Sequence, residues 1–139
     1  MKKFASKALV LFLLMSICMT SVAEAAGRAS LTIRSSEMEA IATGKGKIAI
    51  VFSIAGTGYM SELGAKSITI YEKSGTSWVY ADSYSSRDEG MIGTDVAYFG
   101  NTITYSGTSG VEYKIAVTLY AKKANGISDS CSDTFYVTA

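Results

Sequence analysis

The sequence VEYKIAVTLYAK, residues Val111 to Lys122, decides the fold class of this chain. Every second residue from Val111 onward is apolar or aromatic, and the residues between them include Glu112 and Lys114. An α-helix cannot keep apolar residues at a spacing of two on one side, whereas a β-strand places alternate side chains on opposite faces. We therefore predict a half-buried strand over these residues.

A second apolar alternation covers residues 47–55, where Ile48, Ile50 and Phe52 share one face. The other face carries Ala49 and Val51, which predicts a central strand covered on both sides. Shorter strand-like segments lie between glycine-containing turns, and residues 37–43 fit either a strand or a helical turn. These shorter segments are residues 29–34, 66–73, 78–84, 101–106 and 132–138.

Seven to eight short strands without a long helix predict an all-β fold, an antiparallel two-sheet β-sandwich. The register of the last two strands is constrained by the turn at Asn125-Gly126. A two-residue loop would place Phe135 against the polar face of its partner strand. A three-residue loop places Ile115 opposite Phe135 instead. We therefore predict an odd-length loop or a bulge, with Gly126 in a left-handed conformation.

The N-terminal residues 1–25 have the pattern of a signal peptide. Three lysines precede an eleven-residue apolar run at 8–18, and Ala23-Glu24-Ala25 is a small-x-small cleavage site. The apolar run is shorter than a membrane-spanning helix requires. We expect cleavage after Ala25, export from the cell, no stable membrane anchor afterwards, and one domain over residues 26–139.

The composition argues against several functional classes. The 139-residue chain has 13 Lys and Arg against 12 Asp and Glu, without a basic stripe, so nucleic acid is not an expected partner. Histidine is absent, which removes the most frequent general base and metal ligand. We identify no catalytic residue, no cofactor site and no metal site; the acidic turn at 87–90 fits a solvated turn better than a calcium loop.

Residues 107–126, GTSGVEYKIAVTLYAKKANG, resemble the F strand and the following loop of fibronectin type III and related immunoglobulin-like domains. Those domains carry a tyrosine near the start of strand F, whose hydroxyl bonds back to the preceding turn. Tyr113 occupies the matching place, and Asn125-Gly126 matches the loop. The resemblance implies an immunoglobulin-like or fibronectin III-like sandwich, as in small exported bacterial proteins, with structural roles for Tyr113 and Gly126. It implies nothing about function.

Two aromatic segments are candidate binding sites. Trp78, Tyr80 and Tyr84 are expected to share one strand face, either as an exposed platform for a sugar or a protein, or packed inside with Val79 outward. The second candidate is a mobile contact loop at residues 56–64 that presents Tyr59 and Met60; a plain connection is the alternative.

Cys131 is the one cysteine left after cleavage, because Cys18 lies in the signal segment. Two interpretations stay open. A free cysteine is most often a small buried apolar side chain. An exposed thiol would instead join two copies by a disulfide in an oxidising compartment.

Together these features predict an exported, non-catalytic β-sandwich that binds an extracellular protein or glycan. The contact surface would be the Trp78 face or the end loops at 56–64, 87–90 and 123–126. The alternative is a structural, self-associating protein, such as a homodimer, assembled through edge strands or Cys131.

Overall fold

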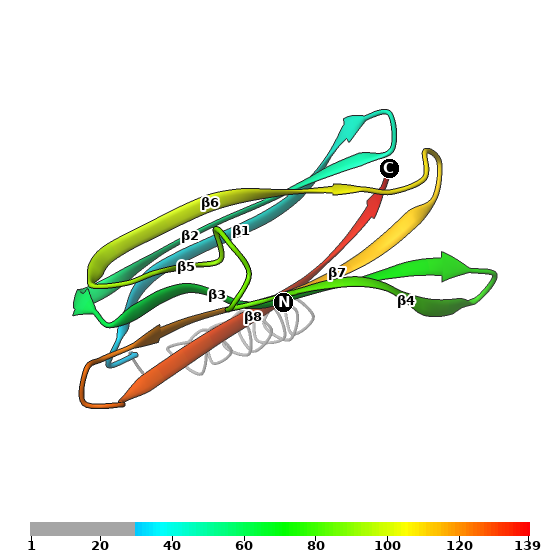
Figure 1. The fold of residues 1–139 in the computed structure, drawn as a ribbon. Coiled ribbons are helices and arrows are strands. Elements are labelled where there is room, and N and C mark those ends of the chain that lie inside the picture. The colour runs from blue at the N-terminus through cyan, green and yellow to red at the C-terminus, as the bar shows by residue number, and fades with distance from the viewer. Residues whose placement is uncertain (1–29) are drawn as a thin grey trace, which may run out of the picture.

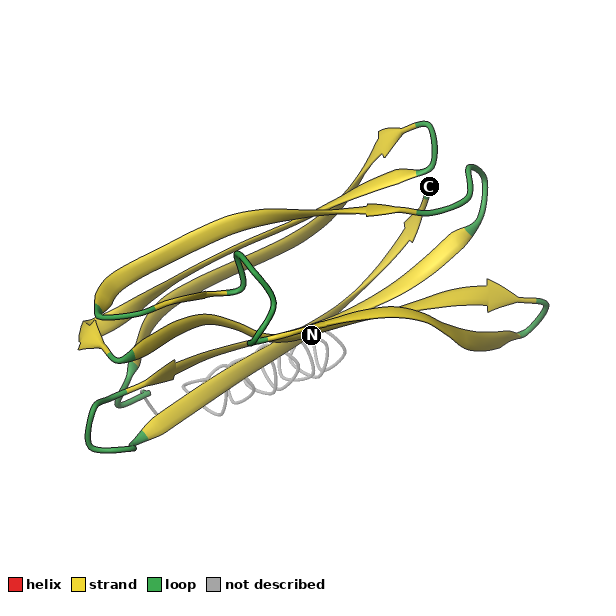
Figure 2. Cartoon of the chain, in the orientation of Figure 1, coloured by secondary structure: helices red, strands yellow, loops and turns green. Residues whose placement is uncertain are grey.

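The computed structural model describes residues 30–139, which form eight strands and no helix (Figures 1 and 2). Within these residues there is accordingly no helix that could cross a membrane. The predicted signal peptide lies outside the described residues. The strands are β1 (Ile33–Gly44), β2 (Lys47–Met60), β3 (Glu62–Ser74), β4 (Ser77–Ser85), β5 (Ile92–Gly93), β6 (Val96–Ser106), β7 (Glu112–Lys122) and β8 (Ser128–Thr138).

The strands lie in two antiparallel sheets, as the alternating pattern predicted. One sheet has the order β1-β2-β6, and the other has the order β4-β3-β7-β8 with β5 beside β3. Figure 1 shows the two sheets stacked over much of their length, with the turns at the two ends. Residues 37–43, which fitted a strand or a helical turn, belong to strand β1.

The core lies between the sheets and consists of the inward residues of β2, β3 and β7. Removing each large aliphatic side chain from water contributes about 1.5–3 kcal/mol to folding. Further core residues are Met60 at the end of β2 and Met91 in the segment before β5. The central apolar residues, all at most 1% exposed, are Ile48, Ile50, Phe52, Ile54, Ile68, Ile70, Ile115, Val117 and Leu119.

The prediction for residues 47–55 is half right. Strand β2 is central, because it pairs with β1 on one side and β6 on the other. It is not covered on both faces, however, since Val51 is 37% exposed and Lys47 is exposed. The reason is that no third layer packs on the outside of this sheet in the described residues, so its outward face stays in solvent.

The β7–β8 hairpin has the predicted odd-length loop. Lys123 N donates to Ile127 O at 2.8 Å, and Gly126 N donates to Lys123 O at 2.9 Å, which leaves residues 124–126 as the loop. Gly126 has a φ of 90°, as expected for a left-handed position. Ile115 therefore pairs with Phe135, as predicted.

Tyr113 makes the contact expected from the resemblance. Its ring is 1% exposed and lies edge-on to Tyr105, with ring centroids 5.5 Å apart. Its hydroxyl oxygen accepts a hydrogen bond of 2.7 Å from Thr108 N in the turn before β7. The ring lies so close to Gly107 that a Cβ at that position would stand 2.7 Å from the ring. The turn is thus fixed to the strand by one side chain.

A group of hydrogen bonds to Asp129 joins the N-terminal end of the described residues to β8. Asp129 Oδ2 accepts hydrogen bonds from Ser30 Oγ at 2.7 Å and from Thr32 Oγ1 at 3.0 Å. The backbone amides of Leu31 and Thr32 also donate to it, at 3.0 and 3.2 Å. Bonds from the Ser30 and Thr32 hydroxyls, with those from the amides, hold the pKa of Asp129 below its ordinary value. This carboxylate closes the seam between β1 and β8.

We predict that Gly126→Ala lowers the free energy of unfolding by about 1–2 kcal/mol, because an L-residue is strained at positive φ. A Cβ at this position meets no atom within 4 Å, so the cost comes from the backbone alone. Gly58→Ala is the matched control, since its Cβ also meets no atom and its φ is not left-handed. Equal urea midpoints for the two variants would show that the left-handed conformation of Gly126 does not require a glycine.

We predict a pH-dependent stability contribution from Asp129. Because its pKa is lower in the folded chain than the unfolded value of 3.8, the contribution is present above pH 3.8 and is lost as the pH falls further. Asp129→Ala should therefore lower the thermal midpoint at neutral pH, and the difference from wild type should narrow below pH 3.8. The control is Asp133→Ala on the same strand, whose carboxylate accepts only from its neighbour Thr134 N in the described structure.

Candidate functional site

The outward face of the β4-β3-β7-β8 sheet carries a row of aromatic and lysine side chains. Tyr80 on β4 pairs with Tyr71 on β3, and Tyr71 pairs with Lys114 on β7. Lys114 in turn pairs with Tyr136 on β8, so one row crosses all four strands. Trp78 lies beside this row, opposite Lys73. We call these six residues the aromatic band: Tyr71, Lys73, Trp78, Tyr80, Lys114 and Tyr136.

Two lysines connect the rings of the band. The Lys114 ammonium lies 4.6 Å from the centroid of Tyr71 and 5.5 Å from that of Trp78. The Lys73 ammonium lies 5.8 Å from Trp78 and forms an ion pair of 3.2 Å with Glu112. A cation over a ring face is attracted by the negative face of the ring's quadrupole. These contacts hold Trp78 down on the sheet.

The aromatic rings form a continuous surface. The centroids of Trp78 and Tyr136 are 5.7 Å apart with the planes tilted by 52°. Tyr80 and Tyr136 are 60% and 61% exposed, whereas Trp78 is half-buried by its neighbours in the band. Such a row offers large apolar area, phenol hydroxyls and ammonium groups to a ligand at low cost in side-chain entropy.

The sequence predicted that Trp78, Tyr80 and Tyr84 share one face of a strand. This prediction is wrong for Tyr84. Strand β4 has a register shift between the pairs Tyr71–Tyr80 and Ile70–Asp82, so Ala81 is an extra residue. A bulge of one residue reverses the faces of everything beyond it. Tyr84 therefore pairs with Ile68 and packs against the core.

The inward position of Tyr84 also changes its ionisation. Partial burial, together with the nearby Asp82 and Asp88 carboxylates, raises the pKa of its hydroxyl. Burial first, and then the neighbouring Tyr113, Glu72, Asp82 and Tyr84, raise the pKa of Tyr105, which lies on the inward face of β6. Both hydroxyls therefore stay protonated, and both rings pack against the core of the sandwich. Tyr84 is thus not part of the aromatic band.

The predicted mobile contact loop at residues 56–64 is not present. Strand β2 continues to Met60 and β3 begins at Glu62, so Ser61 alone separates them. Met60 is 1% exposed and belongs to the core; its side chain packs so close to Gly56 that a Cβ there would stand 2.8 Å from it. The prediction that Met60 is a binding residue is therefore wrong. Tyr59, 82% exposed, remains accessible.

Cys131 lies at the seam between the sheets. It pairs with the buried Leu119, is half-buried, and packs against the core. Its thiol lies 3.3 Å from Ser36 Oγ of β1, within hydrogen-bonding distance for sulfur. Neither sequence interpretation fits fully, since the side chain is partly accessible but points inward toward β1.

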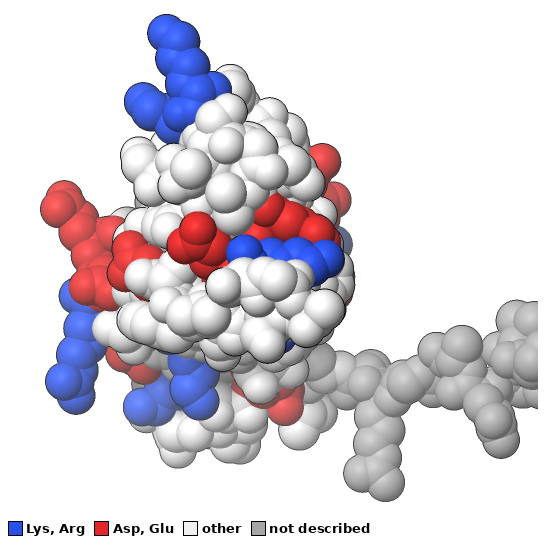
Figure 3. Space-filling model, turned by 90° about the vertical axis from the view of Figure 1, so that its right-hand side faces the viewer, with Lys and Arg blue, Asp and Glu red and all other residues white. Residues whose placement is uncertain are grey.

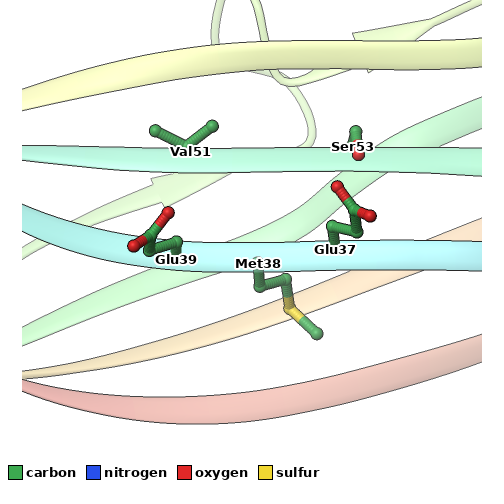
Figure 4. Close-up of a pocket in the computed structure, with 5 residues that line it drawn as sticks. All are labelled: Glu37, Met38, Glu39, Val51 and Ser53. Atoms are coloured by element: carbon green, nitrogen blue, oxygen red, sulfur yellow. The ribbon is translucent and has the colours of Figure 1, made fainter.

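The opposite outer face, on the β1-β2-β6 sheet, has a shallow pocket of about 420 Å³. Figure 4 shows Glu37 and Glu39 extending from β1 beside Ser53 and Val51, while Met38 points the other way. Both glutamates are exposed. Within the described residues, no group of three or more acidic or cysteine side chains is gathered closely enough to hold a metal ion.

Charge is mixed rather than gathered by sign at the end of the sandwich that carries the β1–β2 and β3–β4 turns. Figure 3 shows acidic and basic side chains interspersed there, with wide uncharged surface between them. An electrostatic surface for a polyanion would require basic residues gathered along a stripe. Aromatic surface is thus the more distinctive feature of the molecule.

The comparisons with known proteins are sparse. No family model and no curated protein matches the chain. Among solved structures, it shows a similarity to the solution structure of a putative late embryogenesis abundant (LEA) protein, at 11% identity and a TM-score of 0.35. The match covers 96% of this chain and 87% of that one. Similarity at this level carries no conclusion about fold or function.

Four band residues were not singled out from the sequence: Tyr71, Lys73, Lys114 and Tyr136. A signal for two of them was present, because the register that sets Ile115 opposite Phe135 also sets Lys114 opposite Tyr136. The pairing of β3 with β4 is a local hairpin closed at Ser74 and Ser77, but no sequence signal marks the bulge at Ala81 within it. The pairing of β3 with β7 joins distant segments, and nothing in the local sequence fixes it.

We predict a measurable coupling between Trp78 and Lys114. In a double-mutant cycle of Trp78→Leu and Lys114→Met, the coupling in the free energy of unfolding should be about 0.5–1 kcal/mol. The control cycle pairs Trp78→Leu with Lys122→Met, because Lys122 bonds instead with Glu62, at 3.8 Å. Equal coupling in both cycles would show that Lys114 does not hold the indole.

Proposed function

We propose that this chain is an exported, non-catalytic β-sandwich that binds an extracellular glycan through the aromatic band. The observation that carries the proposal is the outward row of rings and ammonium groups across four strands of one sheet, in which Tyr80, Tyr136 and Lys73 are exposed and the others are half-buried. Sugar rings have apolar C–H faces that stack on aromatic rings, and hydroxyls that need hydrogen-bond partners. The band offers both on a rigid sheet.

The export part of this proposal is supported by the sequence of residues 1–25, which has the charge, apolar length and small-residue triplet of a signal peptide. Removal of these residues takes away Lys2, Lys3, Lys7 and Glu24 and leaves acidic and basic residues nearly balanced. A balanced surface favours recognition by shape and stacking over recognition by net charge.

We further propose that the sandwich is of the fibronectin III-like kind. The support is the three-plus-four arrangement, in which β4 joins the edge of the β3-β7-β8 sheet, together with the Tyr113–Thr108 bond at the start of β7. In immunoglobulin constant-type domains the fourth strand lies in the other sheet. This fold hosts many functions, so the functional proposal rests on the band alone.

A non-catalytic role fits the chemistry of the described surface. The chain contains no histidine, and the shallow pocket at Glu37 and Glu39 is open to solvent, whereas enzyme sites enclose most of their ligand. None of the six band residues is a carboxylate, and the neighbouring Glu112 is paired with Lys73. Nothing in it resembles a general acid paired with a base.

The test uses Trp78, the one tryptophan of the chain, as a reporter inside the proposed site. We expect a panel of cell-surface and plant polysaccharides to include one that changes Trp78 fluorescence in a saturable manner. Tyr80→Ala and Tyr136→Ala should each weaken this binding about tenfold or more, since aromatic anchors carry most of the energy of a binding surface.

The matched controls are Tyr59→Ala and Tyr98→Ala, which remove tyrosines outside the band that are at least as exposed. They should leave the affinity unchanged. Loss of binding in the controls but not in the band variants would move the site elsewhere. If a protein ligand bound saturably through the same band and no glycan did, the band would still be the binding surface, but its ligand would be a protein and not a glycan.

A further inference from the structure

Apart from the two-residue β5, four strands lie at the edges of the two sheets, and three of them carry features that disfavour pairing with another chain. Strand β1 has Arg34, Glu37 and Glu39, and β8 has Asp129 and Asp133. These two strands also lie against each other, through the bonds of Asp129 and the Cys131–Ser36 contact. Charges and covering segments are the usual protection of edge strands.

Strand β4 is protected differently. Its ladder with β3 is interrupted by the bulge at Ala81, and it carries Asp82 just beyond the bulge. A bulge twists an edge away from a regular partner, and a carboxylate there opposes an approaching strand. Three of the four edges are therefore poor templates for a further strand.

Strand β6 has neither the charges nor the bulge that protect the other edges. The segment before it contacts side chains on its inward face, where Asn101 Nδ2 donates to Gly90 O at 2.8 Å. Its eleven residues, VAYFGNTITYS, include no charged residue and no proline. Its pairing with β2 is regular from Ser106 through Tyr98. In the described structure β6 pairs with β2 alone, so one full edge of the strand is unpaired.

The free backbone groups of this edge can be assigned. Gly107 N donates to Gly46 O at 2.8 Å, and hydrogen-bonded pairs alternate along an antiparallel ladder. The residues that bond to β2 are therefore Phe99, Asn101, Ile103 and Tyr105. The N–H and C=O groups of Tyr98, Gly100, Thr102, Thr104 and Ser106 point to the open edge.

We propose that this edge pairs with β6 of a second copy of the chain, antiparallel about a two-fold axis at Thr102. The sheet then continues through both copies in the order β1-β2-β6-β6-β2-β1. This pairing uses the free groups of both strands, because Thr102 meets Thr102 and Gly100 meets Thr104. It consumes the unprotected edge of each copy, so the assembly closes as a dimer.

The side chains of β6 suit this self-pairing. In the same register Phe99 lies opposite Tyr105 of the second copy, and Tyr98 lies opposite Ser106. Aromatic pairs and Thr–Thr pairs are among the favourable cross-strand pairs, and like charges opposite each other are unfavourable. No like charges oppose each other here, because β6 has no charges. The surface is independent of the aromatic band, which lies on the other sheet.

The experiment is sedimentation equilibrium on protein produced from the full-length chain, with three variants at one exposed position. We expect a wild-type dimer that is indifferent to reductant. Thr102→Lys and Thr102→Glu should each raise its dissociation constant about fivefold, because like charges then meet at the axis. An equimolar mixture of the two variants should form a heterodimer tighter than either homodimer.

Thr102→Pro should abolish the dimer in any register, since it removes an outward N–H that β2 does not use. Thr134→Lys, on the exposed outer face of β8, is the control and should leave the dimer unchanged. Unchanged thermal midpoints for Thr102→Lys and Thr102→Glu would exclude unfolding as the cause. A wild-type monomer, a dimer lost on reduction, a dimer that survives Thr102→Pro, or a mixture no tighter than its components would each overturn the proposal.

Discussion

Strand β7 lies between β3 and β8, and its two-residue pleat decides which side chains meet on both faces of that sheet. Ile115 and Val117 point inward, where they face the aliphatic side chains of β2 across the core. The same pleat sends Lys114 outward between Tyr71 and Tyr136. The core and the aromatic band are therefore two consequences of one register, and a slip of one residue would exchange them.

Two local devices hold that register. At one end the left-handed Gly126 allows a three-residue loop, which brings Phe135 opposite Ile115. At the other end the Tyr113 hydroxyl accepts the Thr108 amide and fixes the turn before the strand. Both devices lie close to β7 in sequence. The alternation and the turn chemistry predicted the Gly126 loop, and the resemblance of residues 107–126 to fibronectin III-like domains implied the Tyr113 contact.

The edges of the two sheets differ in how they meet solvent. The Asp129 carboxylate draws residues 30–32 onto β8, so the β1–β8 side is closed by hydrogen bonds. On the other side β4 is interrupted by its bulge, and β6 is left regular and uncharged. The proposed binding through the band and the proposed pairing through β6 use separate sheets, so one would not obstruct the other.

The sequence by itself determined most of the strands, their alternating faces and the β7–β8 loop, because each follows from period-two patterning or from neighbours within a turn. The Tyr113 contact was implied by the resemblance to fibronectin III-like domains. The sequence could not show that Ala81 is an extra residue in β4, and so it misplaced Tyr84. It also took Met60 for an exposed loop residue. Only the tertiary structure decided these positions, the neighbours of Trp78 and the open edge of β6. The physical reason is that these features depend on a bulge inside the β3–β4 hairpin, on pairing between strands far apart in the chain, and on which face of a sheet receives the other sheet.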